Sequence, residues 1–508
     1  MSIIVRLTPA FLPDRLPPVR IVLDRETGTP VNRQIADQLR GEVAAGRLAS
    51  GARLPAIRDL ARELGVNRDT VATAYERLSA EGVLESTVGR GTFVAESGGA
   101  AAPKAAEPTL APQVERLLDF ERARPRYPEK EGAVSMHALV PEPALYPVDD
   151  FRKALNRALL EGGPELLLYG GPQGHPALRR ELAARLSDAG IAANAEDLVL
   201  CHGASQGISL SVRLFAAPGD AVAVEEPTYN NVLATLFALG MRPVPVPMTH
   251  EGPDLDALER TLSRPEVKLF YTIPTFHNPM GISTSAAHRR ALLQVAARCG
   301  KPVVEDAFEM DLWHDGPPAP PLAALDRAGW VVHLFSFSKS LFPGARVGSV
   351  LARGRPVEAL VALKRSTDLS DAQPLQAALA DFVKSGAYDR HLVRLRRVLA
   401  SRRAALMDAL EEHMPDGARW TEPRGGYQVW LELPEGIDSA MLGAEAARAG
   451  VLFAPGHQFN VDGRPSNALR LTVAMADESA ITRAVSTLGA LLRERGAPAP
   501  PRAASVHV

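Results

Sequence analysis

The stretch that decides the fold spans residues 336–348 and reads Ser336-Phe337-Ser338-Lys339-Ser340-Leu341-Phe342-Pro343-Gly344-Ala345-Arg346-Val347-Gly348. It follows an apolar run, residues 330–335, that is typical of a strand. Lys339 stands among hydroxyl residues, and Arg346 follows seven positions later. An amine suits a carbonyl cofactor, while hydroxyls and a guanidinium suit its phosphate, so the stretch predicts a lysine imine. Taken alone, the pattern also fits a solvated surface amine.

Strand-like and helical patterns alternate around this stretch, between residues 131 and 495, which favours an α/β architecture. Open α/β sheets bind ligands just beyond the carboxyl ends of their strands, so polar residues at these positions are the candidates for chemistry. The expected strands are residues 198–200, 221–224, 244–246, 268–273, 302–304 and 331–335, and the expected helices are residues 177–187, 230–238, 288–297 and 392–413.

Three polar segments follow expected strands. Residues 202–207 lead into a helical run, and the amides of the small residues among them, Gly203, Ala204 and Ser205, could bind a phosphate, or the segment could form a tight packing turn. Tyr229 could stack on a flat ring, or it could belong to the core. Asn278 could donate to a ring phenolate oxygen, or it could serve only a Pro-Gly turn.

Two charged residues complete this set. The acidic pair Glu305-Asp306 follows an apolar run, and Asp306 could pair with a ring nitrogen, which makes the ring an electron sink, or it could cap a helix. Arg470 lies inside a strand-like run and needs an anion. A carboxylate held bidentately would satisfy it, and so would a structural salt bridge.

The N-terminal part of the chain carries a different pattern. Apolar residues recur every four positions from Val31 to Val43, and two shorter helical patterns follow, separated by a turn at Gly65. Asn67 suits the N-cap of the third helix, whose first turn places Arg68 and Thr70 outward. This is the pattern of a helix-turn-helix with a recognition helix, although a three-helix interaction module is the alternative.

A hairpin wing is expected after the third helix. Two short β-prone runs flank the tip Gly89-Arg90-Gly91. Glycines let the tip approach a nucleic-acid backbone closely, and Arg90 could enter the minor groove or meet a phosphate.

Composition narrows the remaining options. The 508 residues are 46% hydrophobic and 23% charged with a formal net charge of −2, so any DNA binding must come from local charge placement. No apolar run approaches the roughly 18 residues of a membrane helix, and the N-terminus lacks a secretory pattern. The two cysteines have no metal-type spacing, so we expect no metal site, no membrane contact and a reducing cytoplasm.

The N-terminal block resembles the winged helix-turn-helix domain of the GntR family of regulators. The resemblance rests on residues 54–61, 64–71, 74–78, 81–84 and 89–94. A Pro-Ser pair of that family reads Pro55-Ala56 here, which puts one hydroxyl contact to phosphate in doubt. The resemblance implies binding to double-stranded DNA, with these residues facing it: Arg53, Arg58, Arg68, Thr70 and Gly91.

Residues 135–495 resemble the fold type I aminotransferases that depend on pyridoxal 5'-phosphate (PLP). The candidate residues occur in that family's order, and residues 169–174 resemble a segment whose tyrosine, Tyr169, reaches the neighbouring subunit's phosphate. The resemblance implies that Lys339 holds PLP, Asp306 pairs with its pyridinium, Tyr229 stacks on it and Asn278 meets its phenolate oxygen. The residues implied for the phosphate are Ala204, Ser205, Ser336, Ser338 and Arg346.

One departure from the family lies at Phe308, two residues after the acidic pair Glu305-Asp306. The family commonly has a tyrosine whose hydroxyl meets the phenolate oxygen, whereas this chain has Phe308, which cannot donate. Asn278 would then be the main partner of that oxygen.

Taken together, the chain resembles the MocR-type (GabR-like) transcriptional regulators, and the resemblance implies the domain plan. We expect an N-terminal extension (1–20), a winged helix-turn-helix domain (21–95), a flexible linker (96–130) and a fold type I domain (131–495), whose smaller C-terminal α+β part begins near residue 395. A disordered tail (496–508) is expected to follow. A homodimer, head-to-tail, would present two winged domains to paired half-sites of an operator.

Three functions remain open at this stage. In a regulator, an amino-acid or amine effector would form an external aldimine in place of Lys339, with Arg470 holding its carboxylate. In a working aminotransferase with a DNA-binding appendage, Lys339 would also shuttle protons. In a structural relic, no PLP would bind.

Overall fold

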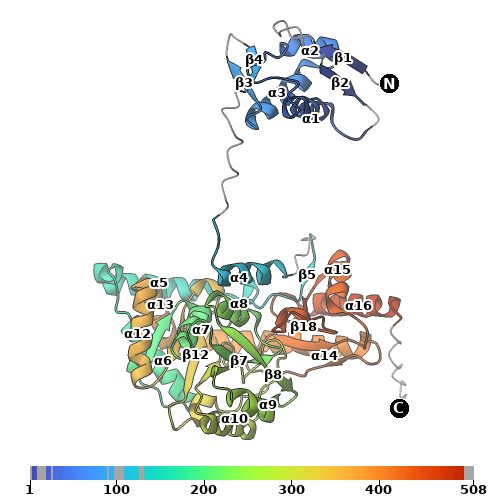
Figure 1. Ribbon diagram of the computed structural model, residues 1–508. Helices are drawn as coiled ribbons and strands as arrows, with labels where there is room; N and C mark the ends of the chain where they lie inside the picture. The colour runs from blue at the N-terminus through green and yellow to red at the C-terminus, as the bar shows by residue number, and fades with distance from the viewer. Residues whose placement is uncertain are drawn as a thin grey trace. The chain divides into compact units, whose positions relative to one another are not determined.

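The structure is a computed structural model that describes residues 3–7, 19–24, 27–87, 91–95, 108–124 and 131–496. The chain forms two compact units, Met1–Thr109 and Leu110–Val508 (Figure 1). Each has its own hydrophobic core, and each is described by itself below.

The first unit is a three-helix domain with two hairpins. Its buried core draws on all three helices, with Leu39, Leu60 and Leu78 fully buried. The hydrophobic period of four seen in the sequence therefore faces this core. The elements are β1 (Ile3–Leu7), β2 (Val19–Leu23), α1 (Val31–Ala44), α2 (Ile57–Leu64), α3 (Arg68–Ala80), β3 (Leu84–Thr87) and β4 (Gly91–Val94).

The expected N-terminal extension, residues 1–20, contains structure that the sequence analysis did not predict. β1 pairs antiparallel with β2, and the expected boundary after residue 20 falls inside β2. Ile21 and Leu23 of β2 are buried in the core of the three helices. The sequence analysis missed this pairing because the connection between the two strands is long and lacks the turn signal of a short hairpin.

The expected linker, residues 96–130, is only partly described. Residues 96–107 and 125–130, and the tail after residue 496, lie outside the described residues. Between them, α4 (Pro112–Arg122) packs on α8 (Asn230–Ala238): the rings of Phe120 and Phe237 meet edge-on, 5.2 Å between centroids. α4 therefore belongs to the second unit and is no part of a flexible linker.

An eight-stranded sheet forms the centre of the second unit (Figure 1). Its strand order is β6-β13-β12-β11-β10-β7-β8-β9, and β13 runs antiparallel to both neighbours. All six expected strands are present. Their bounds, with those of the two added strands, are β6 (Leu198–Cys201), β7 (Ala221–Glu226), β8 (Arg242–Thr249), β9 (Gly252–Pro253), β10 (Val267–Thr272), β11 (Val303–Asp306), β12 (Val331–Ser336) and β13 (Gly348–Leu351).

Alternate residues of the strands face opposite sides of the sheet, and helices cover both faces. Val222 and Val224 pack in one cluster with side chains of α7 and α8, whereas Ala221 and Ala223 pack in another with side chains of α6, α9 and α10. Besides α8, the helices around the large sheet are α6 (Pro176–Asp188), α7 (Gly203–Arg213), α9 (Leu255–Leu262), α10 (Ala286–Cys299), α11 (Leu322–Leu325), α12 (Arg355–Asp368) and α13 (Gln373–Lys384), and α5 (Val148–Gly162) lies beside α13.

A smaller C-terminal part contains a second sheet of order β14-β15-β18-β17. It follows the long helix α14 (Ala387–His413), and a strand from far upstream, β5 (Val134–Ser135), pairs in parallel with β16 (Val451–Leu452). The other elements are β14 (Arg419–Trp420), β15 (Gln428–Glu432), α15 (Ser439–Ala449), β17 (Ala454–Pro455), β18 (Ala468–Thr472) and α16 (Glu478–Glu494).

In the described ranges, no helix has the length and apolar character needed to cross a membrane.

Candidate functional site

The first unit brings two of the DNA-facing candidates together. The segment before α2 pairs with β4, since the Leu54 amide donates to the Thr92 carbonyl at 2.8 Å. This places Arg53 against Gly91, where a Cβ atom would lie 3.0 Å from the Arg53 Nε. Gly91 has a φ of +116°, which favours glycine. Arg53 therefore lies beside the hairpin.

The helix-turn-helix geometry explains the other candidates. Gly65 ends α2 in the left-handed conformation, and the Asn67 side chain caps α3 by accepting from the Asp69 amide at 3.2 Å. Arg68 is exposed at the first turn of α3, and Thr70 is half-buried. Arg58 is exposed on α2, and Arg90 lies outside the described residues.

In the second unit, the candidate cofactor residues line one cavity of about 220 Å³. It lies beyond the carboxyl ends of β6, β7, β10, β11 and β12, where the parallel strands end at one edge of the sheet. Its walls hold ten of the predicted residues together with Leu139, Asn230 and Phe308. The ten are Ala204, Ser205, Tyr229, Asn278, Asp306, Ser336, Ser338, Lys339, Arg346 and Arg470.

Lys339 is a half-buried amine with a perturbed pKa. Its Nζ donates to the Leu139 carbonyl at 2.5 Å, and its own carbonyl accepts from the Tyr427 hydroxyl at 2.6 Å. Burial lowers the pKa of Lys339 to about 8, with Glu309 opposing this shift. The amine is thus more easily deprotonated than a surface lysine, as imine chemistry requires.

Glu309 is a buried carboxyl that the sequence analysis missed. Neither of its oxygens has a hydrogen-bond partner of acceptable geometry in the described part of the chain. Burial raises the pKa of Glu309 to about 8, and the nearby Lys339 limits the rise. Gly426 makes room for it, since a Cβ there would lie 2.6 Å from the Glu309 Oε2. The signal available in the sequence was a third acid close to the acidic pair.

The acidic pair after β11 divides into two roles. Glu305 accepts from the amides of Leu322 and Ala323 at 2.7 and 3.0 Å and so caps α11. Asp306 faces the cavity: its Oδ2 accepts from the Tyr271 hydroxyl at 2.7 Å, and its Oδ1 has no partner among the described residues. Burial raises the pKa of Asp306 to about 6. Glu305, and not Asp306, is therefore the residue that caps a helix.

One end of the cavity has the features of an anion site. α7 begins at Gly203 without a side-chain cap from any described residue, which leaves its first amides available. Arg346 lies next to this turn, and its NH2 donates to the His202 carbonyl at 2.8 Å. Gly203 has a φ of +76°, and a Cβ there would lie 3.2 Å from the Arg346 NH1. The buried Ser338 Oγ has no partner in the described ranges.

A charge network supports the start of α7 from outside the cavity. The His202 ring lies 3.3 Å from both Asp368 and Asp371, and the buried Lys364 Nζ donates to the same two carboxylates at 2.8 to 3.0 Å. Gln206 links the network to α7 by donating to Asp368 at 2.9 Å. Because Lys364 already pairs with both carboxylates, the cluster acts as structural support.

Arg470 and Asn278 form a pair in the opposite wall. The Arg470 NH1 donates to the Asn278 Oδ1 at 2.8 Å, and its NH2 donates to the His137 carbonyl at 2.7 Å. Both partners are neutral, and no ion pair to Arg470 occurs among the described residues. Burial lowers the pKa of Arg470 to about 10, with the nearby Glu309 opposing this shift, so Arg470 stays charged at neutral pH.

Tyr169 does not line the cavity of its own chain. Its side chain is 86% exposed, beside the exposed Leu167 and Leu168. The next residue is held in place, because the Gly170 amide donates to the Ser370 Oγ at 3.0 Å.

Two family models match the chain. The model described as aminotransferase class I and II matches residues 141–488. The model described as bacterial regulatory proteins, gntR family, matches residues 31–94.

Known proteins of both kinds are similar to the chain. It is 33% identical over 372 residues to aromatic-amino-acid aminotransferase 1 of Thermococcus litoralis, covering 72% of this chain and 89% of the relative. It is 29% identical over 475 residues to the probable rhizopine catabolism regulatory protein MocR of Rhizobium meliloti, covering 92% and 95%. Among solved structures, the α-aminoadipate aminotransferase LysN of Thermus thermophilus, complexed with a phosphopyridoxyl-leucine, aligns with a TM-score of 0.67 at 32% identity, covering 76% of this chain and 95% of that one.

The residues of the cavity fit PLP. The unpartnered Asp306 Oδ1 can accept from a pyridinium N–H, and a carboxylate there favours the protonated ring. The amides of α7, the unpartnered Ser338 hydroxyl and Arg346 suit a phosphate dianion. The cavity therefore offers Asp306 for the ring nitrogen of the cofactor, an anion site for its phosphate and Lys339 for its aldehyde.

Proposed function

The chain belongs to the MocR-type transcriptional regulators, which join a GntR-family DNA-binding domain to a PLP-binding domain of the class I and II aminotransferase family. From this premise we propose that an amino acid or amine bound at Lys339 controls the binding of the protein to DNA. The observation that supports the proposal is the cavity around Lys339, which gathers ten of the residues predicted for PLP and its effector in a chain that also has a winged helix-turn-helix.

When bound, PLP supplies an aldehyde that reacts reversibly with amines and a ring that withdraws electrons. In our proposal Lys339 holds the aldehyde, Asp306 keeps the ring nitrogen protonated and Tyr229 stacks on the ring. The amides of α7 at Ala204 and Ser205 hold the phosphate, together with Ser336, Ser338 and Arg346.

The missing hydroxyl at Phe308 leaves Asn278 as the donor to the phenolate oxygen. The Asn278 Oδ1 accepts from Arg470, which leaves its Nδ2 to donate. One neutral donor then replaces the donor pair that a tyrosine would complete.

Arg470 selects effectors that carry a carboxylate. Its guanidinium is buried and charged, and within the described ranges its hydrogen bonds go to two neutral groups, the Asn278 amide and the His137 carbonyl. The Phe459 ring, with its centre 5.0 Å away, is a further neutral neighbour. A carboxylate would compensate this charge and form charge-assisted hydrogen bonds. An α-amino acid, with its amine at Lys339 and its carboxylate at Arg470, is therefore the preferred effector.

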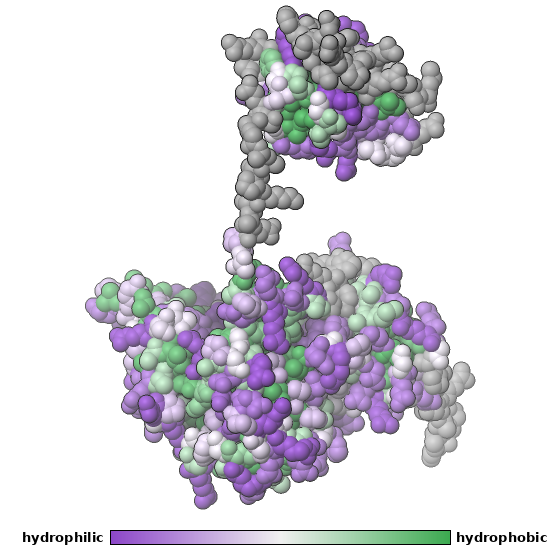
Figure 2. Space-filling view, in the orientation of Figure 1, coloured by the Kyte–Doolittle hydropathy of each residue, from purple (hydrophilic) through white to green (hydrophobic). Residues whose placement is uncertain are grey.

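A homodimer in the cytoplasm, where DNA is accessible, completes the proposal. Support comes from an exposed apolar patch, defined here as Leu159, Leu160, Leu167, Leu168 and Tyr169. Figure 2 shows green side chains gathered at the end of the second unit where α5 lies. Contiguous exposed apolar surface marks interaction sites. In a head-to-tail pair, Tyr169 would reach the partner's phosphate, and two winged domains would bind paired half-sites.

Effector binding can switch DNA binding only if the effector interacts differently with two arrangements of the dimer. In this proposal the effector would take the place of Lys339, and Arg470, within β18 of the C-terminal part, would gain a carboxylate.

A second candidate function is transamination. The observation that favours it is the pKa of Lys339, lowered by burial to about 8, which suits a group that takes and returns a proton near neutral pH. The T. litoralis aminotransferase that is 33% identical to the chain adds support.

Visible absorbance of the purified full-length protein tests the proposal, repeated with a panel of amino acids and amines and followed by DNA binding to its own promoter. We expect an imine band that an α-amino acid changes stoichiometrically, with a matching change in DNA affinity. Lys339→Ala should lose the band and keep DNA binding. Sustained turnover with 2-oxoglutarate and unchanged DNA affinity would favour the aminotransferase. A protein that takes up no PLP would contradict both.

A further inference from the structure

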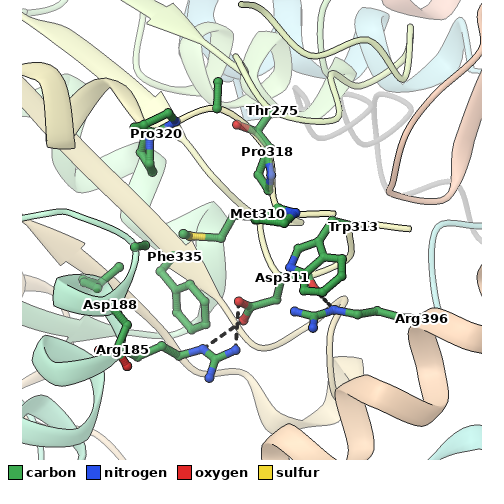
Figure 3. A pocket seen from close by; sticks show the side chains of 15 residues that line it. Arg185, Asp188, Thr275, Met310, Asp311, Trp313, Pro318, Pro320, Phe335 and Arg396 are labelled. Carbon is green, nitrogen blue, oxygen red and sulfur yellow. Dashed lines mark hydrogen bonds and ion pairs between the residues drawn. The ribbon is translucent and has the colours of Figure 1, made fainter. Parts of the chain in front are cut away.

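A second cavity, of about 330 Å³, lies behind the cofactor cavity in the second unit and shares no lining residue with it. Figure 3 shows prolines of residues 317–321 and Thr275 at one end and Arg185 and Arg396 at the other, with Asp311 between the two arginines. Met310 and Phe335 form an apolar wall. A pocket of this size, mostly apolar with a few converging polar groups, is the usual form of a small-molecule site.

Most of the charge in this cavity is already matched. Arg185 donates from Nε and NH2 to the two Asp311 oxygens at 3.2 and 2.9 Å, and its NH1 donates to Asp389 at 2.8 Å. The Asp311 Oδ2 also accepts from the Tyr388 hydroxyl at 2.8 Å. The charges of Arg185 and Asp311 are therefore already compensated within the protein.

Arg396 is the exception. Its Nε donates to the Asp311 backbone carbonyl at 2.7 Å, and its guanidinium lies 3.8 Å from the centre of the Trp313 ring. Its two terminal nitrogens form no hydrogen bond or ion pair with any residue in the described ranges. Burial lowers the pKa of Arg396, which reflects a charge that is only partly compensated. Asp188, the other charged residue of the wall, is exposed to water.

We propose that this cavity binds a small organic acid, whose carboxylate contacts the free side of Arg396 and whose apolar body lies against Met310, Phe335 and the Trp313 ring. A carboxylate matches the paired donors of a guanidinium, and an apolar body suits the wall. The size is sufficient, because a cavity of roughly 150 Å³ holds a benzene ring.

The site would report to the cofactor cavity through a short chain of hydrogen bonds. Tyr388 donates to Asp311 and also contacts the Ser340 Oγ at 2.6 Å, and Ser340 adjoins Lys339. Phe335 of the cavity wall likewise directly precedes Ser336. An acid that displaces Arg396 from Trp313 or shifts Asp311 would therefore affect Lys339 through Tyr388 and Ser340.

The test uses Trp313 fluorescence of the full-length, PLP-loaded protein titrated with 3-phenylpropionate, 4-methylpentanoate and benzoate. We expect a saturable change for at least one acid, lost in Trp313→Phe and at least ~10-fold weaker in Arg396→Gln. The matched control Arg397→Gln, an exposed arginine next on α14, should bind as the unaltered protein does. The amides of the same acids should bind at least ~10-fold more weakly.

Three results would overturn the proposal. The first is that none of the three acids gives a saturable response up to about 10 mM. Any dissociation constant would then be higher than the millimolar value expected of a minimal site. The second is equal binding of the acid and its amide. The third is binding that survives Arg396→Gln but is lost in Arg470→Gln, which would place the acid in the cofactor cavity. Circular dichroism of each variant verifies that it is folded.

Discussion

At the scale of single residues, the cofactor cavity is defined by polar groups whose pKa values burial has shifted. Asp306, Glu309, Lys339 and Arg470 all have pKa values shifted by burial, and all lie at or next to one cavity. Such clusters mark functional sites because the fold spends stability to keep them there. Glu309 stands out among them, since it faces Lys339 and Arg470 without a hydrogen-bond partner in the described ranges.

Glu309→Gln should flatten the pH dependence of stability in the cofactor-free protein. The folded pKa of Glu309, about 8, lies above its unfolded value of 4.5, so its contribution is complete below pH 4.5 and is lost as pH rises through 8. One proton corresponds to at most about 1.4 kcal/mol per pH unit. Thermal unfolding between pH 5 and 8 measures the slope.

The matched control for this prediction is Glu435→Gln, because Glu435 is exposed in a loop of the C-terminal part. Its melting temperatures should follow those of the unaltered protein at every pH. A Glu309→Gln variant with an unchanged slope would show that Glu309 stays ionised, held by Lys339.

At the scale of elements, the start of α7 shows how a short segment makes a phosphate site. The helix begins at a glycine in the left-handed region, and a Cβ there would lie 3.2 Å from the Arg346 guanidinium. Arg346 itself has a φ of +45°. Two uncommon backbone conformations are therefore placed side by side, as is frequent where a fold binds a ligand.

Gly203→Ala should weaken PLP binding roughly tenfold, because a left-handed alanine costs roughly 1–2 kcal/mol and its Cβ pushes Arg346 away. Equilibrium titration of the cofactor-free protein with PLP measures the effect. Gly344→Ala, in the same loop region as Arg346, adds a Cβ whose nearest neighbour is 3.9 Å away and should change little. Equal affinities for the two variants would show that the turn does not bind the phosphate.

The recognition helix gives a prediction for the first unit. Arg68→Ala should weaken binding to the protein's own promoter by roughly 5- to 100-fold, as expected for loss of one base or phosphate contact. Electrophoretic mobility at moderate salt measures the affinity. Arg33→Ala removes a comparably exposed arginine from α1 and should have little effect. If the two variants bind equally well, α3 is not the helix that contacts the bases.

The elements also show what could be predicted from sequence. Each expected strand of the large sheet is present, because a buried strand and its following polar residue are local in the chain. The β1–β2 pairing, the docking of α4 on α8 and the β5–β16 pairing were missed, since each joins segments that carry no mutual signal. In the site, the backbone carbonyls of His137 and Leu139 were missed for a related reason: any residue type can present a carbonyl. The roles of Asp306, Lys339 and the residues around them remain predictions.

At the scale of the whole molecule, the exposed apolar patch is the feature that the isolated chain leaves unexplained. Leu160 is 83% exposed, and Leu167 is 69% exposed. Exposing such side chains costs free energy that association would recover. In the proposed dimer, Tyr169 of this patch would reach the partner's cofactor site, so that assembly would complete that site.

Leu160→Asp should shift the protein from dimer to monomer. Each dimer would carry the change twice, so the dissociation constant should rise on the order of 100-fold. Analytical ultracentrifugation measures the state, and PLP affinity should fall in parallel because Tyr169 no longer reaches a partner. Met441→Glu, at a residue 62% exposed on α15, is the control. A Leu160→Asp protein that stays dimeric would place the interface elsewhere.

The short strand β5 and the residues after it have a practical consequence. The match to the aminotransferase family begins at residue 141, yet β5 pairs with β16, and the carbonyls of residues 137 and 139 accept hydrogen bonds from Arg470 and Lys339. A stand-alone enzyme-like fragment cut at the family boundary would lose the edge of one sheet and the anchors of both Lys339 and Arg470. A fragment that starts near residue 108 would keep them, along with the helix α4 that covers α8.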